Sequence, residues 1–315
     1  MLDADFMDHN PHRRDYWSRW AFANHPFRAG YTLVLFVLFS AVGTAQIETG
    51  SWQDQPNFSK TQAVAAAPGA TVVFAAGETA VFALGLDSEG RANGEVQRFG
   101  KADGLSRAEI AAVALAPEWG KAIVGYEEGT FDLVDIDADG TLGGVLSVRD
   151  LAEADLPGSK RPNQLAVSGK SLLVCTDIGV VEYDLEALEV RDTWKLELNG
   201  QQLSVRAAVL SAGKWWLATS AGLWSAAENA AFPGDPATWE LEEGLSLLGA
   251  EDLYDVVVGD DGRLAVLERR QGPDAIWVAQ AGVPSWTEVT AGLMEDWTGL
   301  TSDGVSLWAT TPFGI

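Results

Sequence analysis

The sequence predicts an all-β protein built as a β-propeller of four-stranded blades. A short unit returns six times along the chain, its period is about 40 to 50 residues, and no stretch shows a helical pattern. Each unit reads as a strand end, a tight turn containing Gly, an apolar strand, a second break and another apolar strand. A β-sandwich also has short strands and Gly turns, but it would not return the same unit six times. We therefore expect about six blade units, the last of them truncated.

The repeated units and their spacing define the expected blades. The second breaks of successive units are 39 to 53 residues apart, and further strands with linking turns, such as "ATWELEEGLS", lie between the units. The units cover residues 67–84, 116–136, 167–185, 210–226, 257–279 and 300–315. Their second breaks lie at Ala80, Gly129, Gly179, Gly222, Ala275 and Gly314.

Tryptophan is concentrated in these repeated strands. The stretch "LSAGKWWLATSAGLW" (210–224) alone holds three, and an aromatic cage for a ligand is one use of such a stretch. Because the residues recur within the units, we expect most of them to pack between neighbouring blade sheets. The residues are Trp215, Trp216, Trp224, Trp277 and Trp308.

The N-terminal 45 residues have the order of a secretory signal peptide. Four arginines within residues 12–30 precede the apolar run 31–42, and the small residues 43–45 follow it. A membrane anchor is the alternative, but the run is shorter than the roughly 20 apolar residues that span a bilayer. The sequence predicts that 1–45 is removed before Gln46, that the mature chain crosses the inner membrane, and that residues 46–315 form the propeller.

The sequence lacks the residues and motifs that most enzymes use for catalysis. His9, His12 and His25 all lie in the leader, so the mature chain has no histidine for a Ser-His-Asp or Cys-His nucleophile or for a zinc site. Cys175, the one cysteine, lies in an apolar strand pattern and is expected to be buried rather than reactive. No P-loop and no GxGxxG motif opening a helix occurs. We expect no catalytic residues and no cofactor.

Charge limits the partners. The leader holds four acidic and four basic residues, so its removal leaves the net charge at −24. Such a surface repels phosphate backbones, which excludes nucleic acid as an expected partner.

One stretch has the pattern of a metal loop. In "DIDADGTLGG", Asp135, Asp137 and Asp139 alternate before Gly140, as in the first half of a calcium loop. The twelfth position is Leu146 instead of the Glu that an EF-hand loop requires. An ordinary hairpin turn is therefore the alternative to a calcium site.

Motifs over residues 50–225 resemble the N-terminal propeller of the PorZ family of the Bacteroidetes type IX secretion system. They comprise a "DGLS" turn, a strand ending in "GY", a "GSK" connection followed by Asn, a "T-x-x-G" strand pair ending in "DL", and a "DT" dipeptide. The later units fit only the looser pattern of regulator-type propellers. The matching residues are Asp103 to Ser106, Gly125 and Tyr126, Gly158 to Lys160 with Asn163, Thr176 to Leu185, and Asp192 with Thr193.

The resemblance implies a non-enzymatic protein of the attachment complex at the outer-membrane surface. Such a protein assists delivery of anionic lipopolysaccharide to the sortase PorU, which modifies secreted cargo, and its partners are PorU and other attachment-complex proteins. Members carry a second propeller and a C-terminal sorting domain, so this chain is expected to be a fragment that ends within a blade.

Two other functions stay open. The periplasmic sensor of a hybrid two-component regulator shares the "GL" turns and the W-[AS]-T strands, and a membrane helix with a kinase domain downstream would select it. A propeller lyase or hydrolase is the third alternative, which the absence of histidine disfavours.

Overall fold

The computed structural model describes residues 61–66, 71–87, 91–246, 252–259, 261–279, 285–290, 297–302 and 307–310. The predicted signal peptide and Gly314 lie outside these residues. No helix in the described part is both long and apolar enough to cross a membrane.

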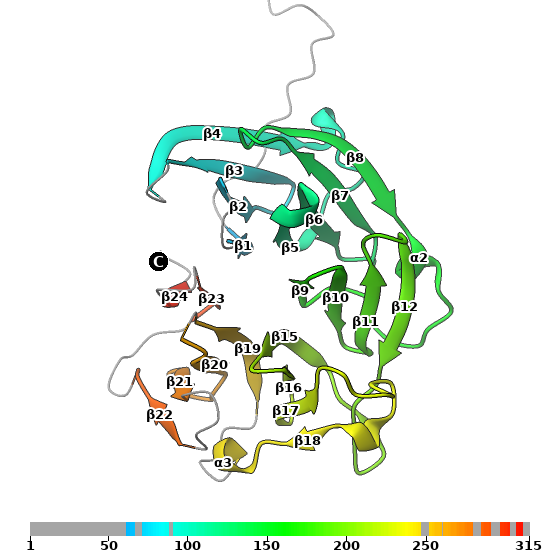
Figure 1. Ribbon diagram of the computed structural model, residues 1–315, viewed down its shortest axis with the longest axis vertical. Helices are drawn as coiled ribbons and strands as arrows, with labels where there is room; N and C mark the ends of the chain where they lie inside the picture. Colours follow the sequence, from blue (N-terminus) through cyan, green and yellow to red (C-terminus); the bar gives the residue numbers. More distant parts are fainter. Residues whose placement is uncertain are drawn as a thin grey trace, which may run out of the picture. The chain divides into compact units, whose positions relative to one another are not determined.

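The described chain forms five four-stranded antiparallel sheets, each made of consecutive strands (Figure 1). We number these blades 1 to 5 in chain order. Blade 1 comprises β1 (Ala63–Ala65), β2 (Val72–Ala76), β3 (Ala80–Leu86) and β4 (Ala92–Gly100); blade 2 comprises β5 (Ile110–Ala116), β6 (Lys121–Tyr126), β7 (Phe131–Ile136) and β8 (Leu142–Val148); blade 3 comprises β9 (Gln164–Ser168), β10 (Ser171–Thr176), β11 (Gly179–Asp184) and β12 (Glu189–Trp194); blade 4 comprises β15 (Val205–Ser211), β16 (Lys214–Thr219), β17 (Gly222–Ala227) and β18 (Glu240–Leu241); blade 5 comprises β19 (Leu253–Val258), β20 (Leu264–Glu268), β21 (Ala275–Ala279) and β22 (Trp286–Glu288).

Short elements connect the blades and complete the chain. β23 (Gly299–Ser302) pairs with β24 (Leu307–Thr310), and β13 (Glu197–Leu198) pairs with β14 (Gln201–Gln202). The short helices are η1 (Lys101–Asp103), η2 (Pro117–Trp119), α2 (Asp150–Glu153), η3 (Pro236–Thr238) and α3 (Glu243–Ser246).

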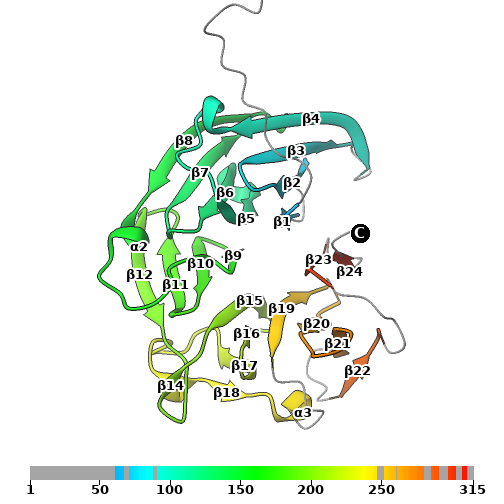
Figure 2. The ribbon, with the colours of Figure 1, turned by 180° about the vertical axis from the view of Figure 1, so that it is seen from behind.

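The innermost strands of successive blades lie side by side around a central region (Figures 1 and 2). β1 contacts β5, β5 contacts β9, β9 contacts β15, β15 contacts β19, and β19 contacts β23. β23 also contacts β1. This sequential arrangement is that of a β-propeller and confirms the predicted fold class.

The hydrophobic core is divided among the spaces between neighbouring blades. Phe74 and Val81 of blade 1 share a cluster with Val113 and Val124 of blade 2, and each later pair of blades encloses its own cluster. The middle strands are therefore covered on both faces, and β11 is buried along its whole length. Outer strands such as β4 have mostly exposed side chains because their long edge faces solvent. The continuous apolar runs of the sequence are these doubly covered strands.

The predicted second breaks lie where each blade turns into its third strand. Ala80, Gly179, Gly222 and Ala275 are the first residues of β3, β11, β17 and β21. Gly129 lies in the turn just before β7, with a positive φ of 91°. The repeat identified from the sequence is thus the hairpin of the second and third strands.

The predicted number of blades was wrong. The described residues contain five four-stranded blades, not about six, and the last repeated unit contributes only the two-stranded sheet β23–β24. The sequence unit marks a pair of strands rather than a complete sheet, so counting units overestimates the complete blades. The expected truncation of a last blade stays a prediction.

Candidate functional site

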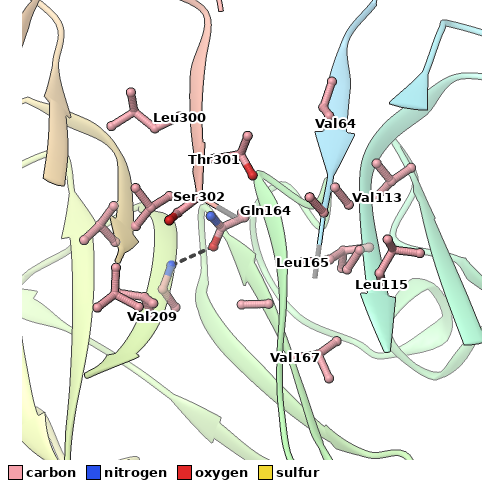
Figure 3. Close-up of a pocket in the computed structure, with 18 of the residues that line it drawn as sticks. Val64, Val113, Leu115, Gln164, Leu165, Val167, Val209, Leu300, Thr301 and Ser302 are labelled. Carbon is pink, nitrogen blue, oxygen red and sulfur yellow. Dashed lines mark hydrogen bonds between the residues drawn. The ribbon is translucent and has the colours of Figure 1, made fainter. Parts of the chain in front are cut away.

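The central region holds a cavity of about 340 Å³ lined by all six innermost strands, β1, β5, β9, β15, β19 and β23 (Figure 3). Most of the lining side chains are apolar, such as Val64, Val113 and Val209, and the described lining residues include no acidic or basic one. Polar side chains come from Gln164 of β9 and from Thr301 and Ser302 of β23.

Gln164 and Asp255 are polar exceptions at one repeated position of the innermost strands. Strand register places Gln164 opposite Cys175 in blade 3 and Asp255 opposite Leu267 in blade 5. The corresponding positions of the other inner strands are apolar: Ala63, Ala112, Ala207 and Leu300. The repeat therefore favours a small or apolar residue here, and two blades depart from it.

The two side chains join four innermost strands through hydrogen bonds. Gln164 Oε1 accepts from the Ala208 N–H of β15 at 2.8 Å, as drawn in Figure 3, and Gln164 Nε2 donates to Asp255 Oδ1 at 3.2 Å. The Asp255 carboxylate also accepts from the N–H groups of Val256 at 2.9 Å and Leu300 at 2.8 Å. These bonds satisfy backbone donors that strand pairing leaves free at the inner edges of the blades.

The surroundings of Asp255 change its acidity. Burial raises the pKa of Asp255 to about 7, against the opposing effects of the Leu300 and Val256 N–H groups and of the Arg269 charge. The nearby thiol of Cys175 is fully buried, and burial followed by the Asp255 charge raises the pKa of this thiol. Cys175 is therefore a packed, unreactive residue, as the sequence predicts.

Two of the motifs that suggested the family meet on one buried carboxylate. Asp132 of β7 is fully buried and accepts hydrogen bonds from Ser106 N at 2.8 Å, Ser106 Oγ at 2.7 Å and Tyr126 Oη at 2.6 Å. Ser106 ends the "DGLS" turn and Tyr126 ends the "GY" strand. Burial and the Asp132 carboxylate raise the pKa of Tyr126, so its hydroxyl stays a donor.

The "T-x-x-G" motif is a repeated turn. Thr176 Oγ1 donates to Gly179 O at 2.9 Å and accepts from Ile178 N at 3.2 Å. Thr219 repeats both contacts in blade 4, donating to Gly222 O at 2.8 Å and accepting from Ala221 N at 3.0 Å. A threonine at the end of the second strand thus closes the turn into the third strand.

The "GSK" connection and its Asn position the loop between blades 2 and 3. Lys160 Nζ donates to the carbonyl oxygen of Ala152 at 2.8 Å and to that of Ala154, which satisfies acceptors at the end of α2. Asn163 Nδ2 donates to Val205 O of β15 at 2.9 Å, which ties this loop to blade 4. The motif residues therefore hold the backbone of this loop in place.

The predicted calcium residues lie in and beside a tight hairpin turn between β7 and β8. Gly140 N donates to Asp137 O at 2.8 Å, and Asp139 Oδ1 accepts from Thr141 N at 3.0 Å, which lowers the pKa of Asp139. The Asp135 carboxylate forms an ion pair with Lys121 instead of turning toward the other two. Within the described residues, no group of three or more Asp, Glu, His or Cys side chains is placed to hold a metal ion. The structure does not bring these three carboxylates together, because Asp135 pairs with Lys121 and Asp139 accepts from the hairpin backbone.

The tryptophans pack as predicted wherever their side chains are described. Trp215 and Trp224 belong to the cluster between blades 3 and 4, and Trp216 and Trp277 pack in the cluster between blades 4 and 5. The side chain of Trp308 lies outside the described residues. These aromatic residues form interblade core rather than a cage for a ligand.

The sequence patterns did not single out three polar residues that the structure shows to be important: Gln164, Asp255 and Asp132. Gln164 and Asp255 could have been found by aligning the inner strands, where a polar residue interrupts an apolar position. Asp132 carried no such signal, because acidic residues are frequent near turns throughout this chain.

A family model and several solved structures support the propeller fold. The family model of the PorZ N-terminal β-propeller domain of the type IX secretion system matches residues 73–240. A search among curated proteins found no match.

Solved structures show the same architecture at low identity. PorZ from Porphyromonas gingivalis, described as an essential surface component of the type IX secretion system, is 18% identical with a TM-score of 0.53, over 81% of this chain and 36% of that chain. Hydrazine synthase from Kuenenia stuttgartiensis is 12% identical with a TM-score of 0.55, over 83% of this chain and 76% of that chain. The extracellular domain of the putative one-component system BT4673 from B. thetaiotaomicron is 10% identical with a TM-score of 0.55, over 83% of this chain and 33% of that chain.

These structural likenesses establish the propeller fold alone. This chain spans about a third of the length of the PorZ and BT4673 chains that it matches. The family match covers more than half of the chain and contains the Ser106–Asp132–Tyr126 contacts and the Thr176 turn. The chain therefore belongs to the family of PorZ N-terminal β-propeller domains.

Proposed function

We propose that the chain is the N-terminal propeller of a cell-surface component of the type IX secretion system, and that it binds partners without catalysing a reaction. The match of residues 73–240 to the PorZ propeller model carries this proposal. In support, the described lining residues of the central cavity include no acidic or basic one, and Cys175 is buried. Residues 1–45 act as a signal peptide in this proposal, and residues 46–315 form the first of several domains.

The partners in this proposal are proteins of the attachment complex, with the sortase PorU as the specific candidate. In the finer form of the proposal, the whole protein assists delivery of anionic lipopolysaccharide to that sortase. The net charge of −24 disfavours direct contact between this propeller and an anionic polysaccharide. The acidic propeller is thus better suited to hold a protein partner.

Gene deletion with analysis of secreted cargo tests this function. In the deletion strain, we expect cargo to be translocated but poorly modified with lipopolysaccharide and poorly retained on the surface. Complementation with the full-length gene should restore attachment. Unchanged attachment in the deletion strain would refute the proposal.

A periplasmic sensor of a two-component regulator is the second candidate. The fold likeness to the extracellular domain of the BT4673 one-component system favours it. Extending the reading frame past Ile315 separates the two candidates. A second propeller and a sorting domain support the secretion role, whereas a membrane helix and a kinase domain in the same polypeptide support the sensor.

A further inference from the structure

The loop between β17 and β18 presents an aromatic side chain to solvent. Phe232 is 73% exposed, more than any other large apolar residue in the described part of the chain, and it belongs to none of the clusters described between the blades. Ala231 and Ala237 of the same loop are also exposed. At the end of the loop, Trp239 is buried and packs against Trp194. The loop therefore joins a core residue to an exposed apolar tip.

Hydrogen bonds fix the backbone on both sides of this tip. The Phe232 carbonyl oxygen accepts from Asp235 N at 3.0 Å and from Thr238 Oγ1 at 2.7 Å. The next carbonyl oxygen, of Pro233, accepts from the buried indole N–H of Trp239 at 2.9 Å. Proline at this position also restricts the backbone. An aromatic side chain on such a fixed backbone loses little conformational freedom on binding, which is the property of an interface anchor.

The loop also lies against the neighbouring blade (Figure 1). A Cβ atom on Gly234 would lie 3.1 Å from the Thr193 carbonyl oxygen and 3.4 Å from a carboxylate oxygen of Asp192, both in β12 of blade 3. Because the loop itself belongs to blade 4, two sheets support the segment that carries Phe232. The tip is thus part of a firm surface at the junction of blades 3 and 4.

The charges of this loop have one sign. Between Lys214 and Arg263 the chain has ten acidic residues and no Lys or Arg. Three of the ten are exposed within the loop or at its end: Glu228, Asp235 and Glu240. Within the described residues, no cation forms an ion pair with any of these three. The apolar tip is therefore flanked by uncompensated negative charge.

We propose that Phe232 anchors a docking surface for a protein that presents an apolar pocket with a rim of Lys and Arg side chains. The phenyl ring fills the pocket, and the flanking carboxylates face the basic rim, which sets the orientation and the rate of association. The same carboxylates repel nucleic acid, anionic glycans and anionic membrane surfaces. This inference rests on the proposed function, because it describes how the propeller would hold a protein of the attachment complex.

Photo-cross-linking of the full-length protein in intact cells tests the surface. Benzoylphenylalanine replaces Phe232 in one strain and Val96 in a control strain, since Val96 of β4 is a 54% exposed apolar residue on blade 1. We expect position 232 to cross-link to another protein, and position 96 to give no cross-link to that protein. Mass spectrometry of the cross-linked peptide should place the contact in an apolar pocket bordered by Lys and Arg.

Affinity measurements with the purified partner give a second readout. Phe232→Ala in the full-length protein should weaken binding by about thirtyfold or more, whereas Val96→Ala should change it by less than about twofold. The double variant Glu228→Gln/Glu240→Gln should slow association, and wild-type affinity should fall as salt is added. Because the Phe232 ring is exposed, thermal denaturation should show that Phe232→Ala is as stable as the wild type.

The outcomes separate this inference from the proposed function. Cross-links from position 232 only to the same polypeptide, to a second copy of it or to a glycan, no cross-link at all, or unchanged affinity in Phe232→Ala would each overturn the docking surface. If cargo attachment is nevertheless lost in the deletion strain, the proposed function stands without it. A partner with the expected pocket that lies outside the secretion system would support the docking surface and contradict the proposed function.

Discussion

At the scale of single residues, the polar groups with the clearest roles are buried and hold backbone segments in place. Asp132 accepts three hydrogen bonds, from the turn before β5 and from the end of β6, and the donors Ser106 and Tyr126 belong to motifs that resemble those of the PorZ propellers. A buried carboxylate that is fully hydrogen-bonded stabilises only if all of its donors stay in place. These motif residues thus meet a structural requirement of the blade.

Replacing the Asp132 carboxylate should destabilise the protein. In Asp132→Asn, the amide group presents a donor where Ser106 and Tyr126 already donate, and the buried polar group left unpaired should lower the free energy of unfolding by about 1–3 kcal/mol. Urea denaturation followed by tryptophan fluorescence measures the change. The control is Asp137→Asn in the exposed β7–β8 turn, which should remain within about 0.5 kcal/mol of wild type. Equal effects of the two variants would contradict the role assigned to Asp132.

Cys175 provides an independent measure of burial. The thiol is fully buried and its pKa is raised, so a thiol-specific reagent should fail to label the native protein at pH 8. After denaturation in guanidinium chloride, one thiol per chain should react. Rapid labelling of native protein would show that β10 is not enclosed between blades as described.

At the scale of elements, the turn from the second to the third strand is the unit that repeats. Thr176 and Thr219 close the same turn, and Gly179 and Gly222 follow it with positive φ values of 114° and 95°. At Gly179, a Cβ atom would lie 2.2 Å from the carbonyl oxygen of Trp194. Both the backbone conformation and the close approach of β12 therefore require glycine.

Two glycine substitutions separate these two requirements. Gly179→Ala should lower the free energy of unfolding by at least about 2 kcal/mol more than Gly213→Ala. Gly213 also has a positive φ, of 72°, but a Cβ there would meet no atom within 4 Å. Thermal and urea denaturation of both variants give the comparison. Similar losses would mean that the approach of Trp194 does not constrain the turn.

These turns also explain how much the sequence could predict. The Gly-containing breaks and apolar runs predict the hairpins of blades 1 to 5, because local turn chemistry and burial are both visible in the residues. The outer strands were harder to predict, since β18 has two residues and β22 has three. Asp255 was not predicted because its importance depends on Gln164, a residue 91 positions away that only the closed ring brings near it.

At the scale of the whole molecule, stability comes from packing between neighbouring blades. Trp194 of blade 3 contacts Trp215 and Trp239 of blade 4, with ring centroids 5.5 and 5.7 Å apart. Leu173, Val180 and Leu217 belong to the same buried cluster. Because each blade has apolar faces on both sides, no blade can bury its surface without its neighbours.

Truncating this interblade cluster should weaken the whole ring. Trp194→Ala should lower the free energy of unfolding by about 3–5 kcal/mol because it leaves a cavity between two sheets. Trp194→Phe should cost less, since the buried indole N–H of Trp194 has no hydrogen-bond partner in the described structure. Calorimetry should still show a single transition for the Phe variant. A loss in the Ala variant below about 1 kcal/mol would contradict the packing described for blades 3 and 4.

Whether this propeller serves as a binding module of the type IX secretion system is tested most directly by cross-linking the full-length protein in intact cells. Lysine-reactive cross-linking followed by affinity purification and mass spectrometry identifies the partners and the residues that touch them. We predict cross-links from lysines of this propeller, such as Lys101 and Lys195, to proteins of the attachment complex, and their loss in a strain that lacks that complex. Cross-links confined to a kinase domain within the same polypeptide, or none to any secretion component, would contradict the account.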